Sequence, residues 1–68
     1  MKHYVTIDIG GTSIKYGLID ETEQLIEDQE MPTEAYKGGP SILEKVAGIV
    51  DYYRAKVEVA GICLSSSG

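Results

Sequence analysis

The sequence predicts an α/β fold in which three strands are followed by a helix and a fourth strand, in the order β-β-β-α-β. Three observations predict it: apolar alternation near the N-terminus, a helical stripe in the middle, and a nearly uncharged run near the C-terminus. A helical crossover returns the last strand parallel to the first and beside it. The expected sheet is therefore mixed, with strand order 3-2-1-4.

The first third of the chain predicts a hairpin and a further strand. Residues 3–9 alternate between apolar and polar side chains and are rich in β-branched residues, which is typical of a strand. Residues 10–13 (Gly-Gly-Thr-Ser) predict a turn, and residues 14–20 predict the returning strand. Residues 24–31 predict a third strand, acidic and exposed enough to lie near a sheet edge.

The second half of the chain predicts a helix and a buried strand. Pro40 suits the first turn of a helix, where its missing N–H costs nothing. A stripe at helical spacing extends the helix to residue 54 and is formed by Ile42, Val46, Ile49, Val50 and Tyr53. Residues 57–64 predict a buried parallel strand that contains Cys63 as a buried residue. A turn signal follows directly at residues 65–68, so we expect the chain to be truncated there.

Composition excludes several classes of function. The chain has 68 residues, with 6 basic and 11 acidic side chains and a net charge of −5, so we expect no nucleic-acid partner. No apolar run approaches the roughly 20 residues of a membrane span, and no signal peptide is visible, so we expect no membrane partner and a cytoplasmic location. With one cysteine, Cys63, and one histidine, His3, the chain can form neither an internal disulfide nor a zinc ligand set.

The glycine turn carries the chemistry. Gly10 and Gly11 allow the backbone to approach a phosphate closely and to adopt positive φ, and Thr12 adds a hydroxyl donor. Asp8 precedes them, and a carboxylate beside phosphate implies Mg²⁺, held through water. Lys15 on the return strand could add a positive charge.

A pair of glycines occurs in several kinds of turn. The Walker loop and the dinucleotide fingerprint are excluded, because both place their glycines between a strand and a helix, whereas here they join two strands. Two glycines between alternating strands are also common in a plain hairpin turn, where a nearby aspartate caps the backbone. Phosphate binding and a plain hairpin turn thus both stay open on the glycines alone.

Residues 8–20 (Asp-Ile-Gly-Gly-Thr-Ser-Ile-Lys-Tyr-Gly-Leu-Ile-Asp) closely resemble the first phosphate motif of the ROK family, named for repressors, open reading frames and kinases. Residues 60–68 are similar to the fourth strand of that family and the small-residue loop after it, near the sugar. The resemblance covers the whole chain, but its specific part is the first twenty residues. It implies a ribonuclease H-like (actin-like ATPase) half-domain, in which residues 1–68 form the N-terminal part of the first lobe and the second lobe is absent.

The resemblance implies a glucokinase-like or N-acetylhexosamine-kinase-like enzyme that uses ATP and Mg²⁺ to phosphorylate a hexose or amino-hexose hydroxyl. By motif position, Asp8 would orient the metal–phosphate group, and Gly10, Gly11 and Thr12 would bind phosphate. Lys15 would assist them, unless it is only a solvated strand lysine. The candidates for bordering the sugar are Ser66, Ser67 and Gly68, with a plain connecting turn as the alternative.

The remaining machinery is expected elsewhere. In this family an aspartate general base, and in many members a cysteine-rich zinc site, come later in the chain than Gly68. No residue of this chain is therefore expected to be catalytic, and we expect the chain alone to be inactive. For the full-length protein we expect a homodimer whose partners are ATP and a sugar.

Two other functions remain open. A sugar-sensing ROK-type repressor shares the fold and carries a DNA-binding segment ahead of this motif; a start at Met1, just before the first strand, favours the kinase. An actin-like ATPase without a sugar substrate would share the phosphate turn but lack a sugar pocket.

Overall fold

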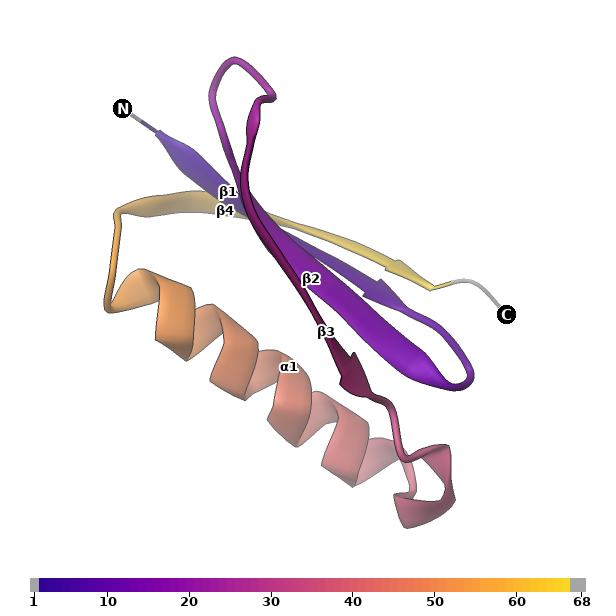
Figure 1. The fold of residues 1–68 in the computed structure, drawn as a ribbon. Coiled ribbons are helices and arrows are strands. Elements are labelled where there is room, and N and C mark those ends of the chain that lie inside the picture. Colours follow the sequence, from indigo (N-terminus) through magenta and orange to yellow (C-terminus); the bar gives the residue numbers. More distant parts are fainter. Residues whose placement is uncertain (1, 67–68) are drawn as a thin grey trace.

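The structure, a computed structural model that describes residues 2–66, is a four-stranded mixed sheet with one long helix on one face (Figure 1). The elements are β1 (His3–Ile9), β2 (Ser13–Asp20), β3 (Leu25–Pro32), the short 3-10 helix η1 (Ala35–Lys37), α1 (Gly39–Arg54) and β4 (Val59–Ser66). The strand order is β3-β2-β1-β4, which confirms the predicted topology.

The register of the hairpin gives the sheet one apolar face. β1 and β2 are antiparallel, with Val5 opposite Leu18 and Ile7 opposite Tyr16. Because alternate residues of a strand point to opposite faces, these four side chains share one face. β4 runs parallel to β1, as the crossover through α1 predicts.

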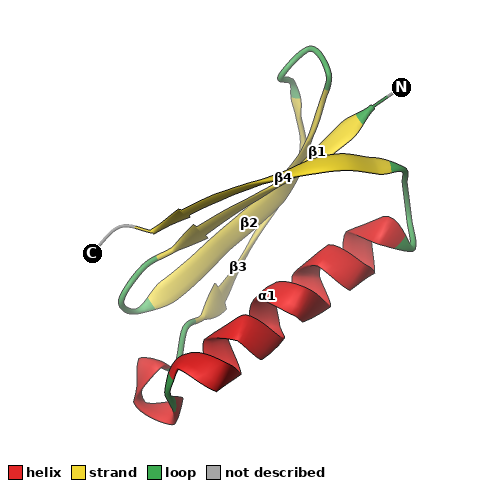
Figure 2. Ribbon diagram, turned by 180° about the vertical axis from the view of Figure 1, so that it is seen from behind, coloured by secondary structure: helices red, strands yellow, loops and turns green. Residues whose placement is uncertain are grey.

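Helix α1 covers this apolar face and leaves the other face of the sheet open (Figure 2). It begins after Gly38, whose φ of 91° is accessible mainly to glycine, and Pro40 lies in its first turn as predicted. Ile49 and Tyr53 from the predicted stripe are buried. They complete a core that also contains Val5, Ile7, Ile14 and Leu18.

Gly17 marks a close approach between β2 and β3. A Cβ atom added at this residue would collide with the main-chain carbonyl oxygen of Glu27 and lie 3.3 Å from the Cα of Asp28. The pairing register of the two strands shifts at the next step, between Leu18 and Ile19. The absence of a side chain at Gly17 therefore permits the ladder to form here.

The prediction of a buried last strand is wrong for the described chain. Cys63 is exposed, and the apolar side chains of Ile62 and Leu64 keep 49% and 59% of their surface accessible. The reason is position: β4 is an edge strand, and α1 packs over β1 and β2. The strand also begins two residues later than predicted, because the N–H of Val57 bonds to the Tyr53 carbonyl at the helix end (2.9 Å).

Within residues 2–66, no helix is both long and apolar enough to cross a membrane.

Candidate phosphate-binding turn

Residues 10–13 form the predicted turn between β1 and β2, but with a different backbone from the one expected. The Gly10 N–H donates to the Ser13 carbonyl over 2.9 Å. Positive φ among the described residues occurs at Glu23, Glu34 and Gly38, and at neither glycine of the turn, so that expectation is wrong. The Gly10 carbonyl bonds outside the hairpin, as described below, so the turn does not need the left-handed residues of a tight primed turn.

Gly11 nevertheless leaves open space at the tip. No heavy atom beyond its chain neighbours lies within 4 Å of a Cβ added there, and both Gly11 and Thr12 are exposed. Neither backbone strain nor internal crowding therefore requires glycine at this position, and the tip of the turn stays open to solvent.

Thr33, directly after β3, anchors the turn, and the sequence pattern did not predict this role. Its hydroxyl donates to the Gly10 carbonyl over 2.8 Å, and its N–H donates to the Thr12 carbonyl over 3.0 Å. The residue is 1% exposed. The sequence offered one signal, a small polar residue after Pro32, and that pattern also predicts an ordinary loop.

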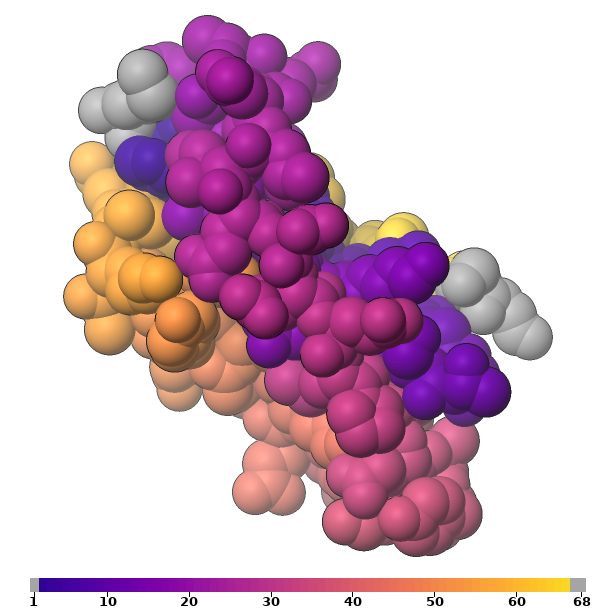
Figure 3. Space-filling model, in the orientation of Figure 1, coloured from indigo at the N-terminus to yellow at the C-terminus, as the bar shows by residue number. Residues whose placement is uncertain are grey.

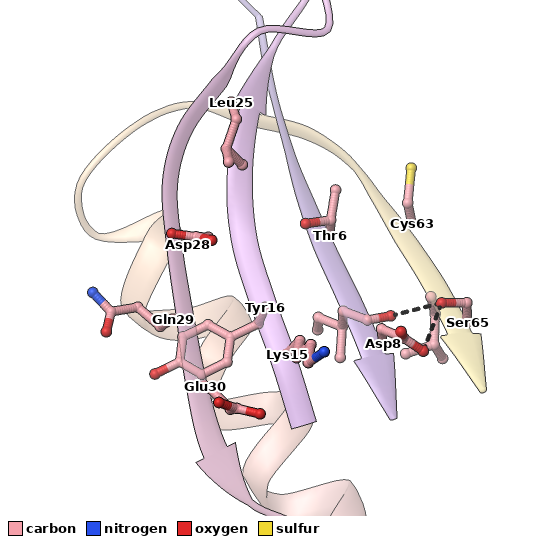
Figure 4. A pocket seen from close by; sticks show the side chains of 12 residues that line it. Thr6, Asp8, Lys15, Tyr16, Leu25, Asp28, Gln29, Glu30, Cys63 and Ser65 are labelled. Carbon is pink, nitrogen blue, oxygen red and sulfur yellow. Dashed lines mark hydrogen bonds between the residues drawn. The ribbon is translucent and has the colours of Figure 1, made fainter. Parts of the chain in front are cut away.

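Asp8 and Lys15 lie side by side on the open face, next to the turn. They are directly opposite each other in the β1–β2 register, and the same row continues to Ser65 on β4 and Glu30 on β3. The Ser65 hydroxyl lies 3.2 Å from Asp8 Oδ1 and 3.5 Å from the Ile7 carbonyl (Figure 4). In this row, Lys15 thus lies between the carboxylates of Asp8 and Glu30.

The open face forms a broad hollow of about 920 Å³, with this row at the end nearest the turn. Asp28 from β3 adds a third carboxylate to Asp8 and Glu30, against the single cation Lys15. A phosphate group approaching this lining meets net negative charge. A bound cation would remove that repulsion.

The residues fit a water-mediated magnesium site. No group of three or more His, Cys, Asp or Glu side chains within the described part of the chain could hold a metal ion alone. Mg²⁺ is commonly held by one or two carboxylates, several waters and the phosphates of its substrate. Asp8 is exposed and its carboxylate has one protein hydrogen-bond donor among the described residues, Ser65, which leaves it accessible for such a role.

The predicted sugar-side residues are placed only in part. Ser66 is the last residue of β4, opposite Ile9, and so belongs to the strand where the sequence had predicted a loop. Parallel pairing of Asp8 with Ser65 and of Ile9 with Ser66 extends the strand this far, and Ser66 is exposed. Ser67 and Gly68 lie outside the described residues.

A cluster around Glu34 fixes the segment that carries Thr33. Lys45 of α1 donates to Glu34 Oε1 (2.6 Å) and to the Pro32 carbonyl (2.7 Å), while Lys37 lies 3.0 Å from Glu34 Oε2. The hydrogen bond from Lys45, then those from Lys37 and Tyr36, lower the pKa of Glu34 to about 2. The helix thus holds the chain on both sides of Thr33.

Comparison with known proteins identifies the class. The sequence profile of the ROK family matches residues 4–68, and the chain belongs to that family. It is 51% identical over 65 residues to an uncharacterised protein of Clostridium perfringens, covering 96% of this chain and 22% of that protein.

Two named relatives are sugar kinases. The chain is 30% identical over 70 residues to the glucokinase of Halalkalibacterium halodurans (96% of this chain, 21% of the relative). It is 33% identical over 64 residues to the N-acetylmannosamine kinase of Salmonella newport (94% and 21%). The chain therefore spans about a fifth of the length of the curated relatives that it matches.

Among solved structures, the chain is similar to the Aquifex aeolicus member of the Ppx/GppA protein family. The TM-score is 0.57 at 16% identity, over 96% of this chain and 26% of that one. Identity this low shows the fold alone. That fold is the ribonuclease H-like (actin-like ATPase) arrangement, with sheet order 3-2-1-4 and one helix between the third and fourth strands.

Proposed function

We propose that the complete protein is an ATP-dependent sugar kinase that transfers the γ-phosphate to a hydroxyl of a hexose or amino-hexose. The described chain would be the N-terminal part of its first lobe and supply the phosphate turn. The observation that carries the proposal is the turn itself: an open glycine tip beside an exposed aspartate, in a chain of the ROK family with relatives named as sugar kinases.

Each residue of the site has a part in this proposal. The turn of Gly10, Gly11 and Thr12 binds phosphate oxygens through the Gly11 and Thr12 N–H groups and the Thr12 hydroxyl, because the Gly10 N–H is already bonded to the Ser13 carbonyl. Lys15, opposite Asp8, adds a positive charge next to the turn. Asp8 orients magnesium through water; the ion supplies neutralisation of the phosphate charge when bound. Ser66, with Ser67 and Gly68, borders the sugar. The general base, and with it full activity, is assigned to residues beyond this chain, so the isolated chain is inactive.

An activity screen of the complete gene product tests the proposal. Purified protein is incubated with ATP, Mg²⁺ and single sugars, among them glucose and N-acetylmannosamine, and ADP release is measured. We expect release that depends on one sugar class and on Mg²⁺. Sugar binding without turnover would favour a sensor, and ADP release that ignores every sugar would favour an ATPase.

A pair of isosteric variants assigns the carboxylate. Asp8→Asn removes the charge beside the turn, whereas Asp28→Asn removes a charge that lines the same hollow on β3. We expect kcat to fall on the order of 100-fold in the first variant, the usual scale for losing an electrostatic group of the site. The second variant should keep near-wild-type kcat. Equal kcat values in both variants would refute the role given to Asp8.

A further inference from the structure

We propose that Thr33 is a positioning residue of the phosphate turn: its two hydrogen bonds orient the N–H groups of the turn toward the phosphates. The inference rests on the proposed nucleotide binding and adds a residue outside the glycine motif to that site. Thr33 lies 23 positions from Gly10 in sequence, and its hydroxyl bonds directly to the Gly10 carbonyl.

The orientation of the N–H groups follows from the geometry of the peptide unit. No cis peptide bond occurs among the described residues, and in a trans peptide the C=O and the following N–H point in opposite directions. The Gly10 carbonyl faces the Thr33 hydroxyl, and the Thr12 carbonyl faces the Thr33 N–H. The N–H groups of Gly11 and Ser13 must therefore point away from Thr33. Two alternate peptide units are fixed in this way by a single buried residue.

The Gly11 N–H is the one that this geometry presents at an exposed position. Gly11 lies at the tip of the turn, with open space around it. A phosphate oxygen is held best by backbone N–H groups that already point at it, because no reorganisation is then needed on binding. The tip lies next to the end of β4, at the opposite end of the molecule from the β2–β3 turn (Figure 3).

Thr33 is itself held rigidly, which an anchor requires. The preceding carbonyl, on Pro32, accepts from Lys45 Nζ, and the following side chain, of Glu34, accepts from the same ammonium. Glu34 adopts a left-handed backbone (φ 55°), a conformation that persists in a non-glycine residue when its surroundings enforce it. Helix α1 thus fixes the anchor, and the anchor fixes the turn.

Loss of the hydroxyl should free one peptide unit. Without it, the Gly10 carbonyl loses its partner and can accept from the Ser13 N–H, the ordinary bond of a closed hairpin turn. That change rotates the unit between Gly10 and Gly11 and withdraws the Gly11 N–H from its outward direction. The Thr33 main-chain bond to the Thr12 carbonyl remains, so the hairpin stays folded.

The test is made on the complete gene product with two isosteric or conservative variants and a matched control. Thr33→Val removes the hydroxyl at constant volume, and Thr33→Ser keeps a hydroxyl. Thr22→Val is the control, because its hydroxyl also makes one short side-chain hydrogen bond, to Asp20 Oδ1 (2.5 Å), but in the β2–β3 turn. The dissociation constants of ATP and of adenosine, which lacks phosphates, are measured by calorimetry for each protein.

We expect Thr33→Val to bind ATP roughly tenfold more weakly, which is the scale of losing one hydrogen bond and with it the fixed orientation of one peptide unit. Adenosine binding should be unchanged. Thr33→Ser should bind ATP like the wild type, and Thr22→Val should leave both constants unchanged. A purely structural role for Thr33 would lower the melting temperature without separating ATP from adenosine. Should Thr33→Val not fold, Thr33→Cys, of similar size and with only a weak donor, takes its place in the same comparison.

The outcomes separate the two proposals. If the wild type binds ATP and Thr33→Val binds it with the same affinity, the role of Thr33 is refuted and the kinase proposal is unaffected. Absence of ATP binding by the wild type overturns the proposed function, and this inference with it.

Discussion

Gly17 offers the sharpest test of how the sheet is held together. Gly17→Ala places a methyl group against the Glu27 carbonyl oxygen and within 3.4 Å of the Glu27 carbonyl carbon, both of them main-chain atoms that cannot turn aside. Overpacking of this kind costs about 3 kcal/mol. Alanine also stabilises the fold by ~0.5–1 kcal/mol because it restricts the unfolded chain. We therefore expect the free energy of unfolding to fall by about 2 kcal/mol.

A second glycine supplies the control for the same substitution. Gly48 lies exposed in α1, and a Cβ added there meets no atom within 4 Å. Gly48→Ala should therefore stabilise the protein by about 0.5–1 kcal/mol, the helix-propensity difference between the two residues. Chemical denaturation of the complete gene product gives both free energies of unfolding. The free energy of unfolding of an isolated chain of 68 residues is roughly 3–10 kcal/mol, so the loss expected for Gly17→Ala is a large part of it.

Opposite signs at the two positions support the structure. A Gly17→Ala protein as stable as the wild type would show that β2 and β3 do not approach closely at this point, and would refute the register described for them.

Two further changes test the core and the anchor. Burial raises the pKa of Tyr53 to about 12, and its buried hydroxyl has no hydrogen-bond partner among the described residues, so Tyr53→Phe should stabilise the fold by about 1 kcal/mol in thermal melts; destabilisation would point to a partner for that hydroxyl. Because Lys45 and its neighbours depress the pKa of Glu34 from 4.5 to about 2, this carboxylate contributes stability above pH 4.5 that is lost as the pH falls toward 2. Glu34→Gln should flatten the unfolding free energy in that interval, and a curve parallel to the wild type would contradict the assignment.

Local sequence patterns were sufficient to predict most of the fold. Residues 3–9 alternate so regularly that β1 was predicted with its observed bounds, and the helix was predicted with Pro40 in its first turn and with its observed last residue, Arg54. The strand order followed because a helical crossover leaves few topologies open. In each case the determining interactions are close in sequence or are imposed by chain geometry.

The predictions that were wrong concern features that depend on contacts between residues distant in sequence. Apolar composition predicted a buried β4, but burial depends on what packs over the strand, and in the described chain α1 covers its neighbours instead. Glycine pairs suggested positive φ, whereas the turn takes another conformation because Thr33 holds one of its carbonyls. Thr33 itself could not be recognised, since its importance lies in a contact with a residue 23 positions away.

Whether the glycine turn binds the phosphates of ATP is best measured by the ATP affinity of Gly11→Ala in the complete gene product. The alanine methyl meets no atom of the chain within 4 Å and the φ of Gly11 is not positive, so folding should be unaffected. We expect an unchanged melting temperature and ATP binding weakened by roughly tenfold or more. Unchanged melting together with wild-type ATP affinity would contradict phosphate binding by the turn.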